Sequence, residues 1–390
     1  MNRMSTRLRT VIAPLLAVAG ICTGVSAETI TVCLDGSCDH TSVQAAIDAA
    51  ANGDVIEVAP GYYTVDQAID TAGKAITVRG TTDSSGGPAT ILDGQGGSQV
   101  LRCTSAEGPT TVLESLVIRG GFATQGGGMY CDGTSPTLVN CTFTNNAATS
   151  GGAMYTIRNS APTITDCRFT GNAASYRGGG MYNVDGSSPT LTDTSFTNNT
   201  ATDRGGGMFN FAGSSPHVDR CTFTKNLAIS GGGGMANGNC APTITDSTFT
   251  FNSTSGSGGG MFNSSGGFDD QDVTIIGCTF TGNTADIGGG IRNNFAVANL
   301  TDTFVCENLP DQIDGLYFCN TGNCISGSCT RCAHCPGDFG GDGEVGAEDL
   351  TILLAEWDCT GPDCSADLDG DGTVDSFDLT IFLCNWGSCG

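Results

Sequence analysis

The stretch FTNNTATDRGGGMFN, residues 196–210, decides the fold because its parts recur along the chain at a nearly fixed interval. It combines one aromatic residue, paired asparagines, three consecutive glycines, an apolar pair and a final asparagine. The aromatic residue of its Phe-x-x-Asn element recurs in Phe143, Phe169, Phe196, Phe223, Phe249 and Phe280, and only the last interval is noticeably longer than the others. A fixed period of roughly 20 to 50 residues is typical of a solenoid.

Two further elements keep the same period. The glycine-rich element recurs as Gly128-Met129, Ala153-Met154, Gly180-Met181, Gly207-Met208, Gly234-Met235, Gly260-Met261 and Gly290-Ile291. The third element recurs as Ser135-Pro136, Ala161-Pro162, Ser188-Pro189, Ser215-Pro216 and Ala241-Pro242, each followed by an alternating segment such as Thr-Ile-Thr-Asp. Such short segments, bounded by Gly, Asn, Ser or Pro, suit strands rather than helices.

Three strands per period predict one coil of a parallel β-helix. Equivalent residues then stack at about 4.8 Å, and we expect Met, Tyr/Phe, Leu/Ile and Phe to form inward columns that become a continuous core only through neighbouring coils. Two asparagine columns are expected to bond peptide groups in buried turns. They contain Asn146, Asn172, Asn199, Asn226, Asn252 and Asn283, and Asn183, Asn210, Asn237, Asn263 and Asn293.

These glycine-rich and Phe-x-x-Asn signatures resemble the repeats of the chlamydial polymorphic outer-membrane protein family. The broader architecture is similar to the right-handed, pectate-lyase-like β-helix. The resemblance covers residues 28–318 and implies an all-β, right-handed parallel β-helix solenoid. Within this region, residues 41–50 have a helical apolar pattern after an N-cap candidate, and we expect a helix that covers the first coil.

Residues 1–27 have the layout of a cleaved signal peptide, with three arginines, an apolar run and Val-Ser-Ala before Glu28. The remaining chain is therefore expected to be secreted or displayed on the cell surface, and no later apolar run is long enough to span a membrane. The whole chain has 15 basic and 40 acidic residues; three of the basic and none of the acidic ones fall within 1–27, which leaves a net charge of 12 minus 40, or −28. Nucleic acid would be repelled. We expect a monomer.

Nineteen cysteines remain after cleavage, an odd number, in an oxidising compartment. Cys33 and Cys38 are expected to pair locally. Four cysteines precede the repeat aromatic by two positions, where Thr194 and Ser247 occupy the same column, so we interpret most of them as buried free thiols. They are Cys141, Cys167, Cys221 and Cys278.

No constellation of catalytic residues stands out. A polysaccharide lyase needs a basic residue, and a glycoside hydrolase needs two or three carboxylates at one bond. The one expanded coil, between Met261 and Phe280, contains Asp269, Asp270 and Asp272, which are the only candidates for catalysis. They have no basic partner nearby, so a solvated loop is the competing interpretation.

The C-terminal segment carries the sharpest motif. Residues 367–378 place carboxylates at positions 1, 3, 5, 9 and 12 of a 12-residue loop and glycine at position 6, which is the spacing of a Ca²⁺ loop. The expected ligands are Asp367, Asp369, Asp371, the carbonyl of Thr373, Asp375 and Asp378. A weaker copy precedes it at 338–349, with expected ligands Asp338, Asp342, Glu344 and Asp349, and with Gly340 in place of one ligand.

Each loop leads into a short apolar helix, and the pair resembles a type I dockerin over residues 337–390. That resemblance implies Ca²⁺ as the bound ion and a cohesin-like protein as the partner. A cysteine-rich linker is expected at residues 319–336. The sequence thus indicates an extracellular scaffold or adhesin that contacts polysaccharide and carries a calcium-binding module. The alternative is a polysaccharide lyase or glycoside hydrolase of the β-helix class, delivered by its dockerin.

Overall fold

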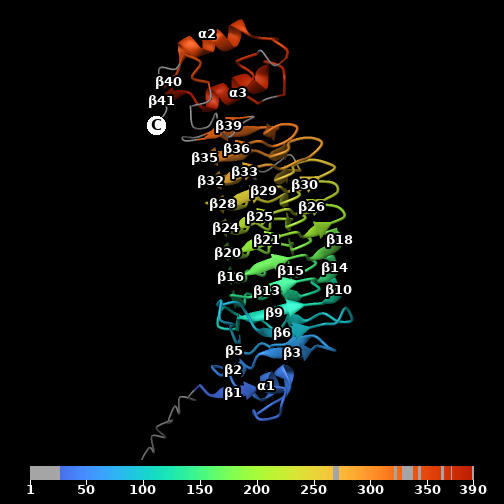
Figure 1. Ribbon diagram of the computed structural model, residues 1–390. Coiled ribbons are helices and arrows are strands. Elements are labelled where there is room, and N and C mark those ends of the chain that lie inside the picture. The colour runs from blue at the N-terminus through green and yellow to red at the C-terminus, as the bar shows by residue number, and fades with distance from the viewer. Residues whose placement is uncertain are drawn as a thin grey trace, which may run out of the picture.

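Stacked parallel strands form a long solenoid with one helix at its N-terminal end and two at its C-terminal end (Figure 1). The computed structural model describes residues 27–266, 272–319, 323–326, 337–340, 344–361, 364–369 and 371–388. The expected signal peptide therefore lies, except for Ala27, outside the described residues. The helices are α1 (Val43–Ala49), α2 (Ala347–Ala355) and α3 (Ser376–Cys384).

The described strands of the solenoid make four parallel sheets, which we number in the order in which one coil visits them. Sheet 1 contains β1 (Thr29–Val32), β2 (Val55–Val58), β5 (Thr77–Gly80), β8 (Val112–Glu114), β12 (Thr137–Val139), β16 (Thr163–Thr165), β20 (Thr190–Thr192), β24 (His217–Asp219), β28 (Thr243–Thr245), β32 (Val273–Ile276), β35 (Ala298–Thr301) and β38 (Tyr317–Cys319). Sheet 2 contains β3 (Gly61–Thr64), β6 (Thr90–Asp93), β9 (Leu116–Arg119), β13 (Thr142–Thr144), β17 (Arg168–Thr170), β21 (Ser195–Thr197), β25 (Thr222–Thr224), β29 (Thr248–Thr250), β33 (Thr279–Thr281), β36 (Phe304–Cys306) and β39 (Cys324–Ser326).

Sheet 3 is the shortest and contains β10 (Phe122–Gln125), β14 (Ala147–Ser150), β18 (Ala173–Arg177), β22 (Thr200–Ala201), β26 (Leu227–Ala228) and β30 (Ser253–Thr254). Sheet 4 contains β4 (Ile69–Asp70), β7 (Leu101–Cys103), β11 (Met129–Asp132), β15 (Met154–Ile157), β19 (Met181–Asn183), β23 (Met208–Phe211), β27 (Met235–Gly238), β31 (Met261–Ser264), β34 (Ile291–Asn294) and β37 (Ile313–Asp314). Near the C-terminus, β40 (Glu344–Val345) pairs antiparallel with β41 (Gly387–Ser388).

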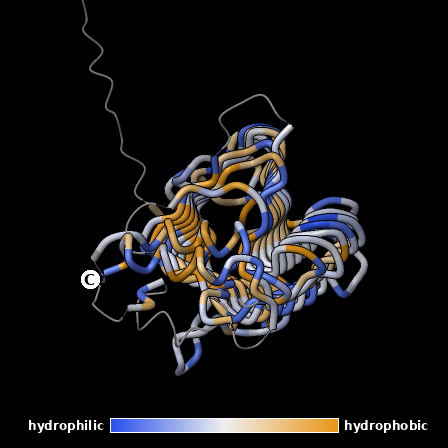
Figure 2. The backbone as a smooth tube through the Cα atoms, turned by 90° about the horizontal axis from the view of Figure 1, so that it is seen from above, coloured by the Kyte–Doolittle hydropathy of each residue, from blue (hydrophilic) through white to orange (hydrophobic). Residues whose placement is uncertain are grey.

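The parallel β-helix is confirmed, and the central coils contain a fourth strand that the sequence pattern did not predict. Sheet 3 follows the buried asparagine and forms the lobe on the right of Figure 2, where the solenoid is seen along its axis. Its strands consist largely of Ala, Thr and Ser, which alternate too weakly in polarity to be recognised.

Inward columns fill the solenoid, as predicted for Met, Leu/Ile and Phe. The phenylalanine rings of successive coils stack with centroids 4.5–4.8 Å apart and planes within 6° of each other, from Phe143 to Phe280. Each of these side chains is fully buried. The register is residue for residue, for example Phe196 opposite Phe223.

The prediction that the Tyr/Phe positions after each Met also face this core is wrong. Successive residues of a strand point to opposite faces, so Tyr155, Tyr182 and Phe209 lie on the other side of sheet 4 from the methionines. There they form a separate buried cluster with Ala236 and Phe262. The solenoid therefore has a main core and a second, smaller one.

The predicted asparagine columns are buried and continuous. The Asn199 backbone N–H and Nδ2 both donate to Oδ1 of Asn226 at 3.0 Å, in the following coil, and Nδ2 also donates to the Phe169 carbonyl at 2.9 Å, in the preceding coil. The same pattern repeats at Asn172 and its neighbours. The second column differs from the prediction, because it lies within strands of sheet 4 and not in a turn. It is a ladder of side-chain amides in which Nδ2 of each residue donates to Oδ1 of the next at 2.8 Å, from Asn183 to Asn293.

The glycine runs occur where the backbone turns sharply or where neighbouring coils approach too closely for side chains. Gly205 has φ of +68°, and a Cβ added there would lie 2.4 Å from the Met208 carbonyl oxygen. A Cβ on Gly207 would lie 2.5 Å from the Gly234 carbonyl oxygen in the next coil. Glycine satisfies both constraints.

Helix α1 covers the N-terminal end as predicted. The Ser42 hydroxyl caps it by accepting the Ala45 N–H at 3.4 Å, and the buried face contains Val43, Ala46 and Ile47. At the other end, β39 lies in the expected linker and pairs with β36. Within the described residues, no helix is long and apolar enough to cross a membrane.

The cysteine predictions are confirmed where the structure describes them. Cys33 and Cys38 form a disulfide, and the four column cysteines are buried free thiols, Cys141, Cys167, Cys221 and Cys278. Burial raises the pKa of Cys221 and Cys278 to about 12, so these thiols are protonated at neutral pH. In the expected linker, Cys324 is disulfide-bonded, while Cys329, Cys332 and Cys335 lie outside the described residues.

We expect Asn199→Leu to lower the free energy of unfolding by roughly 1–3 kcal/mol, because it leaves two buried peptide groups of the preceding coil, the Asn172 N–H and the Phe169 carbonyl, without their partner. Thermal and denaturant unfolding of the purified variant would measure the effect. Thr200→Leu is the matched control, since Thr200 is exposed and adjacent. Equal stability of the two variants would contradict the structural role of the column.

Candidate functional site

The loop before α3 brings three carboxylates together. Asp367, Asp369 and Asp371 each place an oxygen within 4.8 Å of those of the other two. Gly372 allows the loop to curl with φ of +92°, and its N–H donates to the Asp367 carboxylate at 3.0 Å. The Asp369 carboxylate accepts the Asp371 N–H at 2.9 Å. Because Ca²⁺ takes about six to eight oxygen ligands, these side chains could supply one face of a coordination sphere.

The other expected ligands of this loop, Asp375, Asp378 and Thr373, take part in hydrogen bonds within the protein. Both oxygens of the buried Asp378 accept backbone N–H groups, from Leu368 at 2.6 Å and from Asp375 at 2.7 Å. Asp375 caps α3 by accepting the Phe377 N–H at 2.7 Å. The Thr373 N–H donates to Asp371 at 2.8 Å. The structure thus brings the side chains of Asp367, Asp369 and Asp371 together. The side chains of Asp375 and Asp378 instead hold the loop to the start of α3.

Negative charge is concentrated in this loop. Burial, together with the charges of Asp378, Asp371 and Asp367, raises the pKa of Asp369 to about 8, against the opposing effect of the Asp371 N–H. Burial also raises the pKa of Asp378, although three backbone N–H groups oppose the shift. A cation would relieve the mutual repulsion of these carboxylates.

The first loop has the same backbone pattern with fewer described carboxylates. Asp349 is buried and accepts the N–H groups of Gly340 at 2.8 Å and Gly346 at 2.9 Å, as Asp378 does for the equivalent residues of the second loop. Glu344 is exposed in β40, and Asp338 is partly buried. Asp342 lies outside the described residues. Among those that are described, only the second loop gathers three potential metal ligands.

Helix α3 packs against the last coil of the solenoid and against aromatic side chains on either side of it in the C-terminal module. The Phe382 ring lies 6.1 Å from Phe339 and 5.6 Å from Trp386, measured between centroids. Helix α3 contacts β39 (Figure 1). Burial raises the pKa of Tyr317 in β38, and the nearby charges of Asp369 and Asp378 add to the shift. The second loop therefore lies close to the end of the solenoid.

Of the three candidate catalytic residues in the expanded coil, the structure describes Asp272. Asp269 and Asp270 lie outside the described residues. Asp272 precedes β32, and its carboxylate accepts the side-chain N–H of Asn299 at 3.2 Å. This hydrogen bond joins Asp272 to β35, the strand of the next coil in sheet 1.

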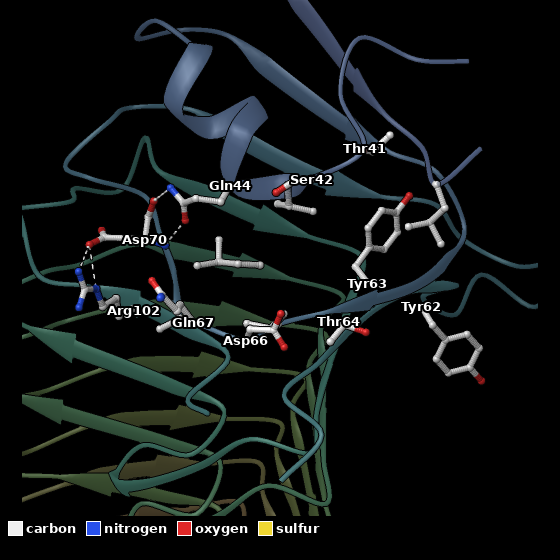
Figure 3. Close-up of a pocket in the computed structure, with 15 residues that line it drawn as sticks. Thr41, Ser42, Gln44, Tyr62, Tyr63, Thr64, Asp66, Gln67, Asp70 and Arg102 are labelled. Atoms are coloured by element: carbon white, nitrogen blue, oxygen red, sulfur yellow. Dashed lines mark hydrogen bonds and ion pairs between the residues drawn. The ribbon is translucent and has the colours of Figure 1, made fainter. Parts of the chain in front are cut away.

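The sequence patterns did not reveal a groove of about 730 Å³ at the N-terminal end. It lies between the start of α1 and the segment that joins β3 to β4, and Asp66 and Gln67 project between these elements (Figure 3). Arg102 and Asp70 form an ion pair at 2.8 Å on one side of it. Exposed Tyr62 lies at the opposite edge. The adjacent tyrosines at 62 and 63, in an irregular coil before the repeats, are the one sequence signal that could have indicated it.

Comparison with known proteins identifies the family of the solenoid. The crystal structure of pectate lyase Pel9A is similar to this chain at 14% identity, with a TM-score of 0.45 and 90% of each chain covered. No curated protein matches the sequence. Residues 74–196 and 127–302 match the family described as right handed beta helix region, and together these matches span more than half of the 390 residues. The chain therefore belongs to the right-handed β-helix family.

Proposed function

We propose that this protein is a secreted or cell-surface β-helix scaffold or adhesin that contacts polysaccharide and carries a Ca²⁺-binding, dockerin-like module. The observation that carries the calcium assignment is the convergence of Asp367, Asp369 and Asp371 within 4.8 Å of one another. Oxygen ligands at alternating positions of a curled loop are the chemistry that Ca²⁺ prefers. Asp375, Asp378 and the Thr373 carbonyl would complete the sphere in the bound state.

A protein partner for the module is supported by its surface. Apolar side chains on or beside α2 and α3 are exposed by 37–54%, namely Leu354, Trp357, Phe377, Leu383 and Trp386. Large exposed apolar side chains on a small module are available to a binding partner. We propose that a cohesin-like protein covers them.

The scaffold role is favoured over catalysis because the fold serves lyases, hydrolases, adhesins and spacers alike, and a reaction needs a site of its own. The one described carboxylate of the expanded coil, Asp272, is hydrogen-bonded to Asn299. Threonine side chains line the outer face of sheet 2, as in β21 and β25. Their hydroxyl groups suit contact with a polymer that presents many hydroxyls.

Calcium binding is expected to order the module, because the unfolded chain offers no preformed site. The two tryptophans, Trp357 and Trp386, both lie in the module, so the tryptophan fluorescence of the full mature chain, excited selectively, reports on the module alone. Adding Ca²⁺ to chelator-treated protein should change that fluorescence. Asp367→Ala should weaken the apparent affinity about tenfold or more, roughly 1.4 kcal/mol, and more than Asp338→Ala does, because Gly340 already replaces a ligand in the first loop.

Asp286→Asn, at an exposed carboxylate of the solenoid, is the control and should titrate like the parent. A spectrum that does not respond to chelator would overturn the calcium assignment. Equal losses from Asp367→Ala and Asp338→Ala would show that the second loop is not the principal site.

Polysaccharide is expected to be bound without being cleaved. Mature protein incubated with neutral and acidic polysaccharides in the presence of Ca²⁺ should release no new reducing ends and no unsaturated products. Release of products that is abolished in the triple variant Asp269→Asn, Asp270→Asn, Asp272→Asn would replace the scaffold proposal with an enzyme whose site is the expanded coil. Product release that survives in this variant would locate catalysis elsewhere.

A further inference from the structure

The groove at the N-terminal end has the build of a small-ligand site. Its volume of about 730 Å³ lies within the range of roughly 300–1,000 Å³ that is typical of such sites. Its floor is apolar, because it is lined by the buried side chains of Val43 from α1, Val65 from the segment after β3 and Ile69 from β4. Polar side chains stand around this floor (Figure 3).

Part of the polar lining is fixed by bonds within the protein. Gln44 accepts the Asp70 N–H at 2.8 Å and donates to the Asp70 carbonyl at 3.1 Å. The Asp70 carboxylate pairs with the Arg102 guanidinium. This network gives the groove one rigid wall, which a ligand would meet already formed.

Other polar groups of the groove have no protein partner. Throughout the described part of the chain, the side chains of Thr41, Asp66 and Gln67 form no hydrogen bond or ion pair, and Asp66 and Gln67 are exposed. They offer a hydroxyl, a carboxylate and an amide from two sides of one groove. The Tyr62 ring, 62% exposed, adds an aromatic surface at the rim.

The charge of the groove selects among ligands. Arg102 is neutralised by Asp70, so the Asp66 carboxylate leaves the lining net negative, in a mature chain that is itself strongly acidic. Anionic ligands would be repelled. An uncharged molecule with many hydroxyl groups fits, since carboxylate and amide groups can bond paired hydroxyls while an aromatic ring and an apolar floor contact C–H surfaces.

We propose that this groove binds a short segment of a neutral saccharide. The inference rests on the proposed contact with polysaccharide and is independent of the Ca²⁺ loop at the other end of the solenoid. In this proposal, Asp66 and Gln67 form hydrogen bonds with the saccharide, and the ring of Tyr62 contacts its C–H surface. The wall formed by Gln44, Asp70 and Arg102 positions the ligand.

The test is isothermal titration calorimetry of the full mature protein with neutral gluco-, xylo- and manno-oligosaccharides, and with an oligogalacturonate as the acidic counter-probe. We expect at least one neutral series to bind and the oligogalacturonate not to bind. The double variant Asp66→Ala, Gln67→Ala should weaken binding about tenfold or more, as expected for the loss of hydrogen bonds to a charged group. Tyr62→Ala should weaken it by roughly threefold to tenfold.

Tyr176→Ala is the matched control. Tyr176 is also exposed and also has an arginine guanidinium over its ring, that of Arg177 at 4.3 Å, as Tyr62 has Arg119 at 5.6 Å. The control should bind like the parent, and unchanged thermal unfolding would confirm that all variants are folded.

The outcomes separate this inference from the proposed function. Undiminished saccharide binding by the double variant would overturn the groove assignment and leave polysaccharide contact in place. Preference for the oligogalacturonate would overturn the assignment to a neutral ligand. If the parent protein binds none of the oligosaccharides, the groove inference is overturned. A separate measurement of binding to intact polysaccharides would then test the scaffold proposal.

Discussion

Peptide groups in the buried turn between sheets 2 and 3 need hydrogen-bond partners that water cannot supply, and the neighbouring coils supply them. Each asparagine of the first column bonds to the coil before it and to the coil after it, as Asn199 does through Phe169 and Asn226. An unpaired buried group costs roughly 1–3 kcal/mol, so a shift of one residue along a coil that contains this column is disfavoured. The residue-for-residue register of the strands and the parallel phenylalanine rings both depend on this constraint.

The repeated part of the fold could be predicted because its signals are local and periodic. The spacing of the phenylalanines from Phe143 to Phe280 indicated the length of one coil. The positions of Asn and Gly follow from what a tight turn that is buried from water requires. The direction of Tyr155 and Tyr182 could not be predicted, because residues on both sides of sheet 4 are apolar and buried. A pattern of period two identifies two faces only when their polarity differs.

The candidate site was predictable in part for a similar reason. The spacing of Asp367, Asp369 and Asp371 determines that they meet on the inside of a curled loop. The same spacing does not reveal that Asp378 is bonded to backbone N–H groups or that Tyr317, from the end of the solenoid, lies beside the loop. The groove near Asp66 was hidden because its walls come from α1 and from irregular coils, where no repeat relates the residues that meet.

The stacked coils also make the molecule a spacer whose length changes in steps. Each coil adds about 4.8 Å along the axis, and the repeated coils meet their neighbours through the same columns, so the gain or loss of one repeated coil would preserve the kinds of contact that join the others. The groove at one end and the acidic loop at the other would keep their own structures while the distance between them changed. Their separation can thus be adjusted without rebuilding either end.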